Sequence, residues 1–221
     1  MKKSLVIFGA GKIAELAHYY FSNDSQYDVK AFSVDGSFLK SNSFQGRPVV
    51  PFEDIINIFP PDDYNIFIAI SYSRLNEDRK EKYLQSKNLG YQMPSYVSSK
   101  ATVLNDHKIG DNCFILEDNT IQPFVSIGNN VTIWSGNHIG HHSIIRDHSF
   151  ISSHVVVSGG VTLGESCFVG VNATLRDHVS IGPKCVIGAG ARILKDANEG
   201  SVFMEKATEA SKVPSSKLRN I

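Results

Sequence analysis

Aliphatic residues recur at every sixth position of the chain from Val97 to Ile193, without a break. A small or apolar residue stands two positions before most of them, and glycine often follows directly. Antiparallel strands would instead alternate with a period of two and have turns of varied spacing. A sustained period of six predicts a parallel β-helix in which each hexad supplies one short strand and one turn. Three hexads close one coil, so residues eighteen apart are expected to stack about 4.8 Å from each other.

The first part of the chain has a different pattern. An apolar run at Ser4–Phe8 leads through a glycine-containing turn into an amphipathic helical pattern from Lys12 to Phe21. A second apolar run follows from Asp28 to Val34. The order of strand, turn, helix and strand predicts a βαβ unit.

The turn of this unit matches G-x-G-x-x-A through Gly9, Gly11 and Ala14. Such a turn presents backbone N–H groups and a helix N-terminus to a phosphate, and Asp35 stands where these folds place an acid near a ribose. Three interpretations remain open: a contact with nucleotide pyrophosphate, a purely structural turn, and a nicotinamide cofactor. We favour the first, because the residues before the hexads are too few for the larger sheet of a dinucleotide dehydrogenase.

The remaining elements before the hexads are short. We expect an edge strand near residues 49–50, a short helix at 53–59, a strand at 64–70, a charged helix at 75–86 and a last strand at 91–96. The predicted domains are a small Rossmann-like α/β nucleotide-binding domain at residues 1–95, a parallel β-helix at 96–197, and a segment at 198–221. We expect this last segment to cap the final coil, because an open coil end exposes unpaired backbone groups.

Charge and composition narrow the function. The 22 basic and 22 acidic residues give a net charge of zero, which argues against nucleic acid or an anionic membrane as the main partner. No apolar run approaches the length of a membrane span, and the opening MKKSLVIFGAGK is too short in its apolar part for a signal peptide. We therefore expect a cytoplasmic protein. Three cysteines separated by multiples of eighteen are predicted to be small core residues of one inward column: Cys113, Cys167 and Cys185.

Histidines gather at outer positions of the hexads: His138, His141, His142, His148, His154 and His178. His142 and His178 share a column but are two coils apart, roughly 10 Å at strand spacing. The separation of His138 and His142 by four residues is not the helical pairing of a zinc site, because these residues lie on a coil. We therefore expect no metal site within one chain.

The βαβ domain followed by a hexapeptide prism resembles the bacterial left-handed β-helix acyltransferases that modify nucleotide-linked amino sugars, the bacillosamine, perosamine and sialic acid acetyltransferase group. The resemblance covers the chain to about residue 203 and is carried by the strings at 140–147 (GHHSIIRD), 158–160 (SGG) and 170–173 (GVNA). It implies left-handed coils. It also places the catalytic histidine of the family at His141, two positions after the ladder residue Ile139.

The sequence departs from the family beside this histidine. Gly140 and His142 replace the acids that flank it, so His142 and Asp147, the nearest carboxylate in sequence, are the candidates to orient His141. The resemblance implies that neutral His141 acts as a base. It also implies that backbone N–H groups of residues 158–160 bind the thioester oxygen.

The activity that the resemblance implies is transfer of an acetyl group from acetyl-CoA to the amino group of a nucleotide-linked amino-deoxy sugar, for a bacterial surface polysaccharide such as O-antigen or capsule. The implied acetyl-CoA-binding residues are Phe150, Gly159, Gly160, Val171, Ala189 and Arg192. The implied nucleotide-sugar-binding residues are Gly11, Lys12, Asp35, Ser71, Tyr72, Arg74 and Trp134. Phe150 stands where the family has a histidine that contacts the acyl donor. Trp134 stands where the family has an asparagine that touches the sugar, and here we expect it to stack on the sugar or base.

The family forms closed trimers with active sites between prisms, so a homotrimer is also implied. Two alternatives remain open: O-acetylation of a sugar hydroxyl by the same site, and a non-catalytic trimeric prism. The missing acids beside His141 favour the non-catalytic prism, whereas His141 itself and the coenzyme-like coils oppose it.

Overall fold

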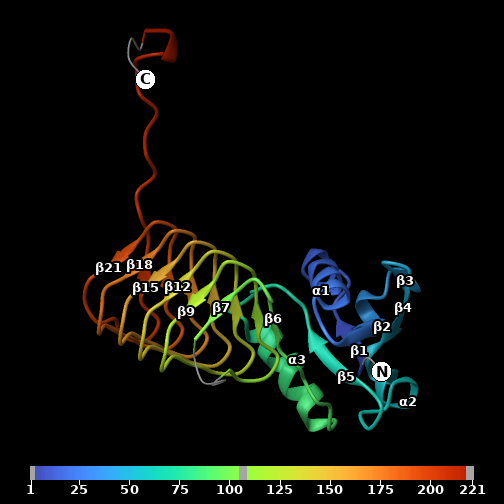
Figure 1. Cartoon of the computed structure of the whole chain (residues 1–221). Coiled ribbons are helices and arrows are strands. Elements are labelled where there is room, and N and C mark those ends of the chain that lie inside the picture. The colour runs from blue at the N-terminus through green and yellow to red at the C-terminus, as the bar shows by residue number, and fades with distance from the viewer. Residues whose placement is uncertain (1–2, 105–108, 218–221) are drawn as a thin grey trace.

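A computed structural model describes residues 3–104 and 109–217 of the chain (Figure 1). These residues form a small α/β part at the N-terminus, a stack of parallel coils, and an extended C-terminal segment. Among the described residues, no helix has the length and apolar character needed to cross a membrane.

The N-terminal part is a mostly parallel sheet with the strand order β3-β4-β2-β1-β5. Its strands are β1 (Lys3–Phe8), β2 (Tyr27–Val34), β3 (Ser43–Phe44), β4 (Arg47–Pro51) and β5 (Asn65–Ile68), of which β3 pairs antiparallel. Its helices are α1 (Lys12–Asn23), α2 (Ile55–Ile58) and α3 (Glu77–Asn88), with 3-10 turns η1 (Gly36–Phe38) and η2 (Phe52–Asp54). The parallel pairing of β1 with β2, which α1 connects, is the predicted βαβ unit.

The strand predicted at residues 91–96 is not part of this sheet. Tyr96 and Val97 form β6, which pairs with β8 (Phe114–Ile115) and so belongs to the first coil. Val97 is the first member of the hexad ladder, so the hexad register decides where Tyr96 pairs. The coil stack therefore begins directly after the connection from α3.

The turn after β1 depends on Gly9 rather than on Gly11. Gly9 has a φ angle of +127°, and a Cβ atom there would lie 2.5 Å from the carbonyl oxygen of Ala69. Only glycine tolerates both that backbone conformation and that contact. Gly11 is exposed and has a φ angle of −112°, and a Cβ atom there would meet no atom within 4 Å. Gly11 is therefore under no packing constraint.

The hexads form the left-handed parallel β-helix that was expected. Within the described residues, each hexad gives a two-residue strand that ends on the ladder residue, except that Ile109 forms a single bridge to Ile127. Strands eighteen residues apart pair in parallel. The seven-stranded sheet contains β6, β8, β11 (Thr132–Ile133), β14 (Phe150–Ile151), β17 (Phe168–Val169), β20 (Val186–Ile187) and β22 (Val202–Phe203). The six-stranded sheet contains β7 (Thr102–Val103), β9 (Thr120–Ile121), β12 (His138–Ile139), β15 (Val156–Val157), β18 (Thr174–Leu175) and β21 (Arg192–Ile193). The four-stranded sheet contains β10 (Ser126–Ile127), β13 (Ile144–Ile145), β16 (Thr162–Leu163) and β19 (Ser180–Ile181).

The ladder residues and their small partners fill the prism as one core. The three cysteines are fully buried in it, and burial raises the pKa of the Cys113 thiol to about 11 and that of the Cys167 thiol to about 12. Phe168 pairs with Val186, so the preceding Cys167 and Cys185 lie on the same face in neighbouring coils. This confirms the stacking of residues eighteen apart.

At each corner of the prism, one residue per coil has a left-handed backbone conformation. Histidine occupies several of these positions, with φ angles of 58–62° at His142, His148, His154 and His178. Histidine, asparagine and aspartate tolerate this conformation better than most residues. The backbone conformation of these corners therefore accounts for part of the histidine cluster seen in the sequence.

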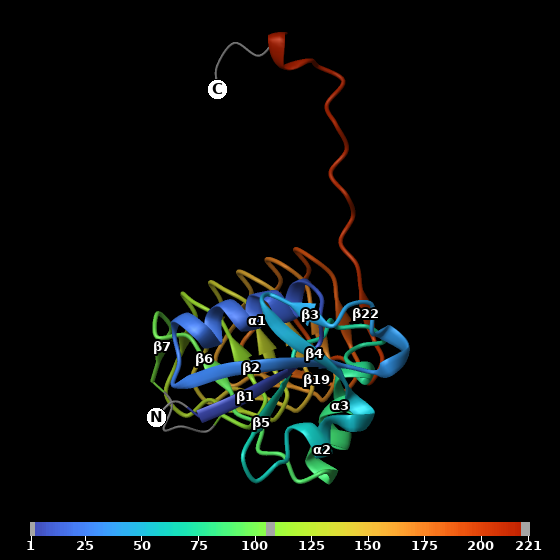
Figure 2. The ribbon, with the colours of Figure 1, turned by 90° about the vertical axis from the view of Figure 1, so that its right-hand side faces the viewer.

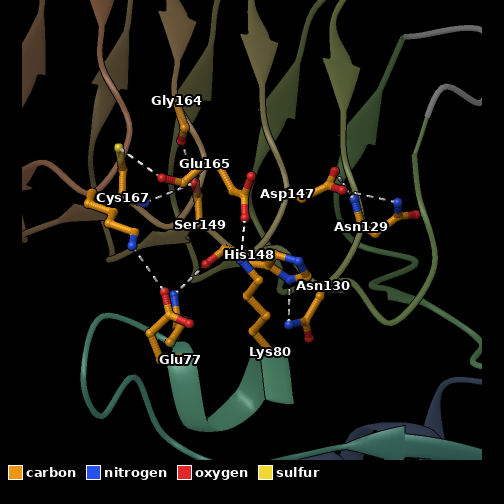
Figure 3. Close-up of polar contacts among 12 residues, drawn as sticks. Glu77, Lys80, Asn129, Asn130, Asp147, His148, Ser149, Gly164, Glu165 and Cys167 are labelled. Atoms are coloured by element: carbon orange, nitrogen blue, oxygen red, sulfur yellow. Dashed lines mark hydrogen bonds and ion pairs between the residues drawn. The ribbon is translucent and has the colours of Figure 1, made fainter. Parts of the chain in front are cut away.

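Helix α3 joins the two parts along one corner of the prism, between the four-stranded and seven-stranded sheets (Figure 3). Near its N-terminus, Nζ of Lys80 lies 2.6 Å from Oε1 of Glu165, which belongs to a later coil. Near its C-terminus, Nζ of Lys87 lies 2.6 Å from Oδ2 of Asp111, which belongs to an early coil. The helix thus runs alongside several successive coils.

Arg79 is the centre of this contact between the two parts. Its guanidinium is buried and donates hydrogen bonds to the carbonyl oxygens of Ile68 (3.3 Å), Asn112 (2.9 Å) and Asn130 (2.6 Å). A guanidinium holds its donors in a rigid planar fork, so one side chain ties β5 to two coils. The N-terminal sheet is thereby held at one end of the prism, as the view from that end shows (Figure 2).

The C-terminal segment caps the prism only in its first part. Ala197 pairs with Ile181, and β22 adds a strand to the seven-stranded sheet beyond β20. Phe203 packs against the core. The coil stack therefore runs past residue 197, where the sequence predicted its end. Residues 204–217 extend away from the prism (Figures 1 and 2), and residues 218–221 of the predicted capping segment lie outside the described residues.

Candidate active site

His141 lies at the corner between the six-stranded and four-stranded sheets, directly after β12 and Gly140. Its backbone N–H donates to Oε1 of Gln122 (2.9 Å), and its carbonyl oxygen accepts from the N–H of Gly160 (2.8 Å). Its ring lies against Gly159, where a Cβ atom would come within 2.6 Å of Cε1. The coils before and after it thus fix the backbone of His141, and Gly159 makes room for its ring.

The two imidazoles of this corner contact each other. Nδ1 of His141 lies 3.1 Å from Nδ1 of His142, with the rings nearly perpendicular at 86°. One of these nitrogens must carry a proton and the other must accept it in a hydrogen bond. If His141 donates, its Nε2 has a free lone pair, which is the state that a base needs. His142 is therefore positioned to orient the ring of His141.

Asp147 is not near this pair, and the expectation that it orients His141 is corrected. Its Oδ1 accepts from the backbone N–H of Asn129 (2.8 Å) at the next corner of the prism. Six residues along the chain lead to a different corner, whereas eighteen lead to the same corner in the next coil. Nearness in sequence therefore says little about contact on this fold.

Most of the residues expected to bind acetyl-CoA border the six-stranded sheet. Gly159 and Gly160 follow β15 at the His141 corner. Val171 and Ala189 are exposed at the opposite edge of that sheet, and Arg192 is exposed on β21 within it. The structure thus brings these five residues to one face of the prism.

Phe150 does not belong to that face, which corrects its assignment to the coenzyme site. It lies on the seven-stranded sheet, is 6% exposed, and stacks on Phe168 with ring centroids 5.6 Å apart. Tyr72 covers it from the N-terminal part, with ring centroids 4.7 Å apart. Phe150 and Tyr72 therefore pack the two parts together.

Trp134 also lies at this contact. Its ring packs against the apolar cluster of the N-terminal part, 6.3 Å from the ring of Phe150. Its indole N–H is buried, and no described residue accepts a hydrogen bond from it. Since the ring already packs against protein, the expectation that it stacks on a sugar or base is corrected within this chain.

A pocket of about 420 Å³ opens at the carboxyl ends of β1, β2 and β5, where parallel sheets bind ligands. Among its lining residues are Gly9, Asp35, Phe38, Ile70, Lys82 and Gln85. Oδ1 of Asp35 lies 2.5 Å from Nζ of Lys82, and the ammonium group also sits 4.1 Å from the ring centroid of Phe52. The expected acid, Asp35, is therefore in the pocket and is held by a largely buried cation.

The other expected nucleotide-sugar residues lie around this pocket rather than in it. Gly11 and Lys12 are exposed at the N-terminus of α1. Ser71 is exposed after β5, and Arg74 forms ion pairs with two pocket carboxylates, Asp78 (2.5 Å) and Glu81 (2.9 Å). Sequence reasoning missed Lys82, because its partner Asp35 is 47 residues away and no local pattern marks it.

The pocket and the His141 corner are separate in one chain. Helix α3 lines the pocket and docks at the corner of His148, whereas His141 lies at the next corner of the prism. Among residues 3–104 and 109–217, no group of histidine, cysteine and acidic side chains could hold a metal ion.

Known proteins share both the repeats and the fold. Residues 106–141, 126–159 and 160–195 match the family described as bacterial transferase hexapeptide (six repeats). No curated protein matches the chain. The acetyltransferase domain of PglB from Neisseria gonorrhoeae superposes with a TM-score of 0.81 at 21% identity, over 92% of this chain and 97% of that one, and it has also been solved with acetyl coenzyme A.

Two further structures agree. A point mutant of perosamine N-acetyltransferase from Caulobacter crescentus, in complex with CoA and GDP-perosamine, gives a TM-score of 0.80 at 19% identity, over 93% of this chain and 95% of that one. WeeI from Acinetobacter baumannii superposes with a TM-score of 0.76 at 21% identity, over 92% of this chain and 97% of that one. Residues 106–195 thus consist of hexapeptide repeats of the bacterial transferase type, carried on a two-part fold that the chain shares with these acetyltransferases.

Proposed function

We propose that the chain transfers an acetyl group from acetyl-CoA to the amino group of a nucleotide-linked amino sugar. The observation that carries this proposal is the state of His141. Its N–H, its carbonyl oxygen and its Nδ1 are each held by a neighbour, while no described residue hydrogen-bonds its Nε2. The names of the similar structures support the same reaction.

The proposed chemistry needs one base and one oxyanion donor. The sugar amine attacks the thioester carbonyl of acetyl-CoA and gives its proton to Nε2 of His141. The tetrahedral intermediate then collapses to the amide, and the CoA thiolate leaves and takes the proton back. The N–H groups of Ser158 and Gly160 are already bonded to carbonyl oxygens, so the N–H of Gly159, which has no partner among the described residues, is the oxyanion donor in this proposal.

The face of the six-stranded sheet offers the coenzyme site. From Gly159 at the His141 corner, it runs to exposed Val171 and Ala189 at the opposite edge. Arg192 on this face is suited to the phosphate groups of CoA. The thioester would then lie beside His141 and the rest of the coenzyme across the sheet.

The nucleotide fits the N-terminal pocket, with Asp35 accepting hydrogen bonds from ribose hydroxyls. Because this pocket lies in the N-terminal part and is separate from His141 of the same chain, we propose that the site is completed by a neighbouring copy in a homotrimer. We place the reaction in the cytoplasm, where the three buried cysteines remain thiols.

The test is turnover of acetyl-CoA with a panel of UDP-, dTDP- and GDP-linked amino sugars and their hydroxyl analogues. Release of CoA is followed with a thiol-detecting reagent, and the product is identified by mass spectrometry. We expect turnover with one amino sugar and loss of it in His141→Asn. Transfer only to a hydroxyl analogue would establish the O-acetylation alternative, and binding of both ligands without turnover would establish the non-catalytic prism.

A further inference from the structure

Phe124 has an unusual conformation for its type. Its φ angle is 66° and its side chain is 58% exposed. The left-handed backbone is common to this corner position of every coil, but phenylalanine tolerates it far less well than the histidine and asparagine that occupy the neighbouring corners. The core does not explain this residue, because the ring lies outside the prism.

The ring of Phe124 packs on His142, one coil further along. The two ring centroids are 4.7 Å apart with a tilt of 40°. The backbone N–H of His142 also donates to the carbonyl oxygen of Pro123, which precedes Phe124 (3.3 Å). Both the backbone and the ring of His142 therefore rest on the Pro123–Phe124 turn, while Nδ1 of His142 lies 3.1 Å from Nδ1 of His141.

We propose that Phe124 is a positioning residue for His141, acting through His142. Its ring holds the His142 imidazole in the rotamer that turns Nδ1 toward His141. In that arrangement, Nδ1–H of His141 donates to the bare Nδ1 of His142, and His142 carries its own proton on Nε2. The Nε2 of His141 is then free. This inference rests on the proposed function for its catalytic meaning, but the ring arrangement can be tested without it.

The arrangement supplies the orientation that a carboxylate would otherwise give. An exposed imidazole has several rotamers within reach, and only those with Nδ1 facing His141 select the productive tautomer. The phenyl ring removes that freedom and shields one side of the hydrogen bond from water, which strengthens it. During transfer, a proton of the amine goes to Nε2 of His141 and returns to the CoA thiolate, so His142 neither gains nor loses a proton.

The direct test is imidazole ¹⁵N NMR of the full chain labelled at histidine, with the signals assigned from His141→Asn and His142→Asn. In the wild type, we expect His141 protonated at Nδ1 and His142 at Nε2. Phe124→Ala should convert both to mixed tautomers, and Phe124→Tyr should retain the wild-type pattern. Alanine keeps the backbone strain and loses only the ring, so this change isolates the ring. Wild-type tautomers in Phe124→Ala would overturn the proposal.

Kinetics give the second readout. We expect Phe124→Ala to lower kcat about 10-fold, a part of the 100- to 10,000-fold that a base contributes, with the KM for acetyl-CoA within two-fold. Phe124→Tyr should restore kcat, and the exposed surface aromatic Tyr19→Ala should leave it unchanged. If Phe124→Ala instead dissociates the oligomer in light scattering while the tautomers persist, Phe124 is a subunit contact and the positioning role is wrong. Absence of turnover in the wild type, with the tautomer shift present, would refute the proposed function alone.

Discussion

Replacing His148 by asparagine tests how the two parts of the chain are joined. His148 is 5% exposed and is the last member of a hydrogen-bonded chain, whose final link to Asn130 is shown in Figure 3. The N–H of Ile68 donates to Oδ1 of Asn112 (2.8 Å), Nδ2 of Asn112 to Oδ1 of Asn130 (2.7 Å), and Nδ2 of Asn130 to Nδ1 of His148 (2.9 Å). The rings of His148 and Tyr83 also pack in a T-shaped arrangement, with centroids 5.6 Å apart. Because Nδ1 accepts in this chain, the imidazole must be neutral at that atom.

The surroundings of His148 favour the neutral form. Burial lowers the pKa of its imidazole, and the ammonium group of Lys80 lowers it further. The carboxylates of Asp147 and Glu165 act in the opposite direction, and Arg79 adds to the lowering. Burial is the largest of these effects, so the folded state resists protonation of His148 more than the unfolded state does.

The size and sign of the effect follow from proton linkage. An imidazole in the unfolded chain titrates near pH 6.5, whereas His148 in the folded chain stays neutral to lower pH. Below about pH 6.5 the unfolded state therefore binds more protons, and the free energy of unfolding falls by at most about 1.4 kcal/mol per pH unit. From pH 7 to pH 5 the loss is at most about 2 kcal/mol.

His148→Asn removes the titrating group and with it this pH-dependent loss of stability. Asparagine already occupies the two preceding positions of the column, Asn112 and Asn130, and it tolerates the left-handed backbone. Between pH 7 and pH 5, we expect the melting temperature of the variant to fall less than that of the wild type, by up to about 4–8 °C at this chain length. His154→Asn makes the same change at an exposed left-handed position and should follow the wild type. Parallel pH profiles for His148→Asn and the wild type would refute the reasoning.

Three further predictions concern the proposed reaction. His141→Asn should lower kcat by about 100- to 10,000-fold with both KM values within a few-fold, and His142→Asn should cost less; steady-state kinetics showing the reverse order would exchange their roles. Gly11→Val should weaken nucleotide-sugar binding in calorimetry, because the new side chain would project from the turn proposed to hold the pyrophosphate. CoA binding should stay intact, because Gly11 is exposed and a side chain there meets no other residue. If neither affinity changes, Gly11 is not part of the site. Lys82→Met should raise the KM for the nucleotide sugar about 10-fold, because Asp35 loses its only described ion-pair partner; an unchanged KM would leave this ion pair a structural role.

The sequence predicted the prism well because its signal is local and repeated. Every hexad carries its own strand, turn and inward residue, so one period defines the entire stack. The residues that orient His141 were harder to predict from the sequence, because the spatial neighbours of a residue on this fold are one or eighteen residues away in the chain. Asp147 is six residues away and therefore at another corner. Gln122 and Gly159 are about one coil of eighteen residues away, and they contact His141.

The charged helix was misleading for a related reason. Charged helix residues usually face solvent, yet Arg79 and Lys82 are 2% and 8% exposed. The acceptors of Arg79 lie 11, 33 and 51 residues away, and Asp35, which binds Lys82, lies 47 residues away. Partners at such separations leave no periodic trace, so burial of these cations could be recognised only from the fold.

The length of α3 explains how this helix serves both parts. Twelve helical residues rise about 18 Å, and four coil steps of about 4.8 Å span about 19 Å. One face of α3 can therefore meet successive coils from Asp111, through His148, to Lys184, while Lys82 and Gln85 line the pocket. With this length, the pocket is held in one orientation relative to the prism, and a neighbouring copy related by symmetry would present its own His141 at one fixed place.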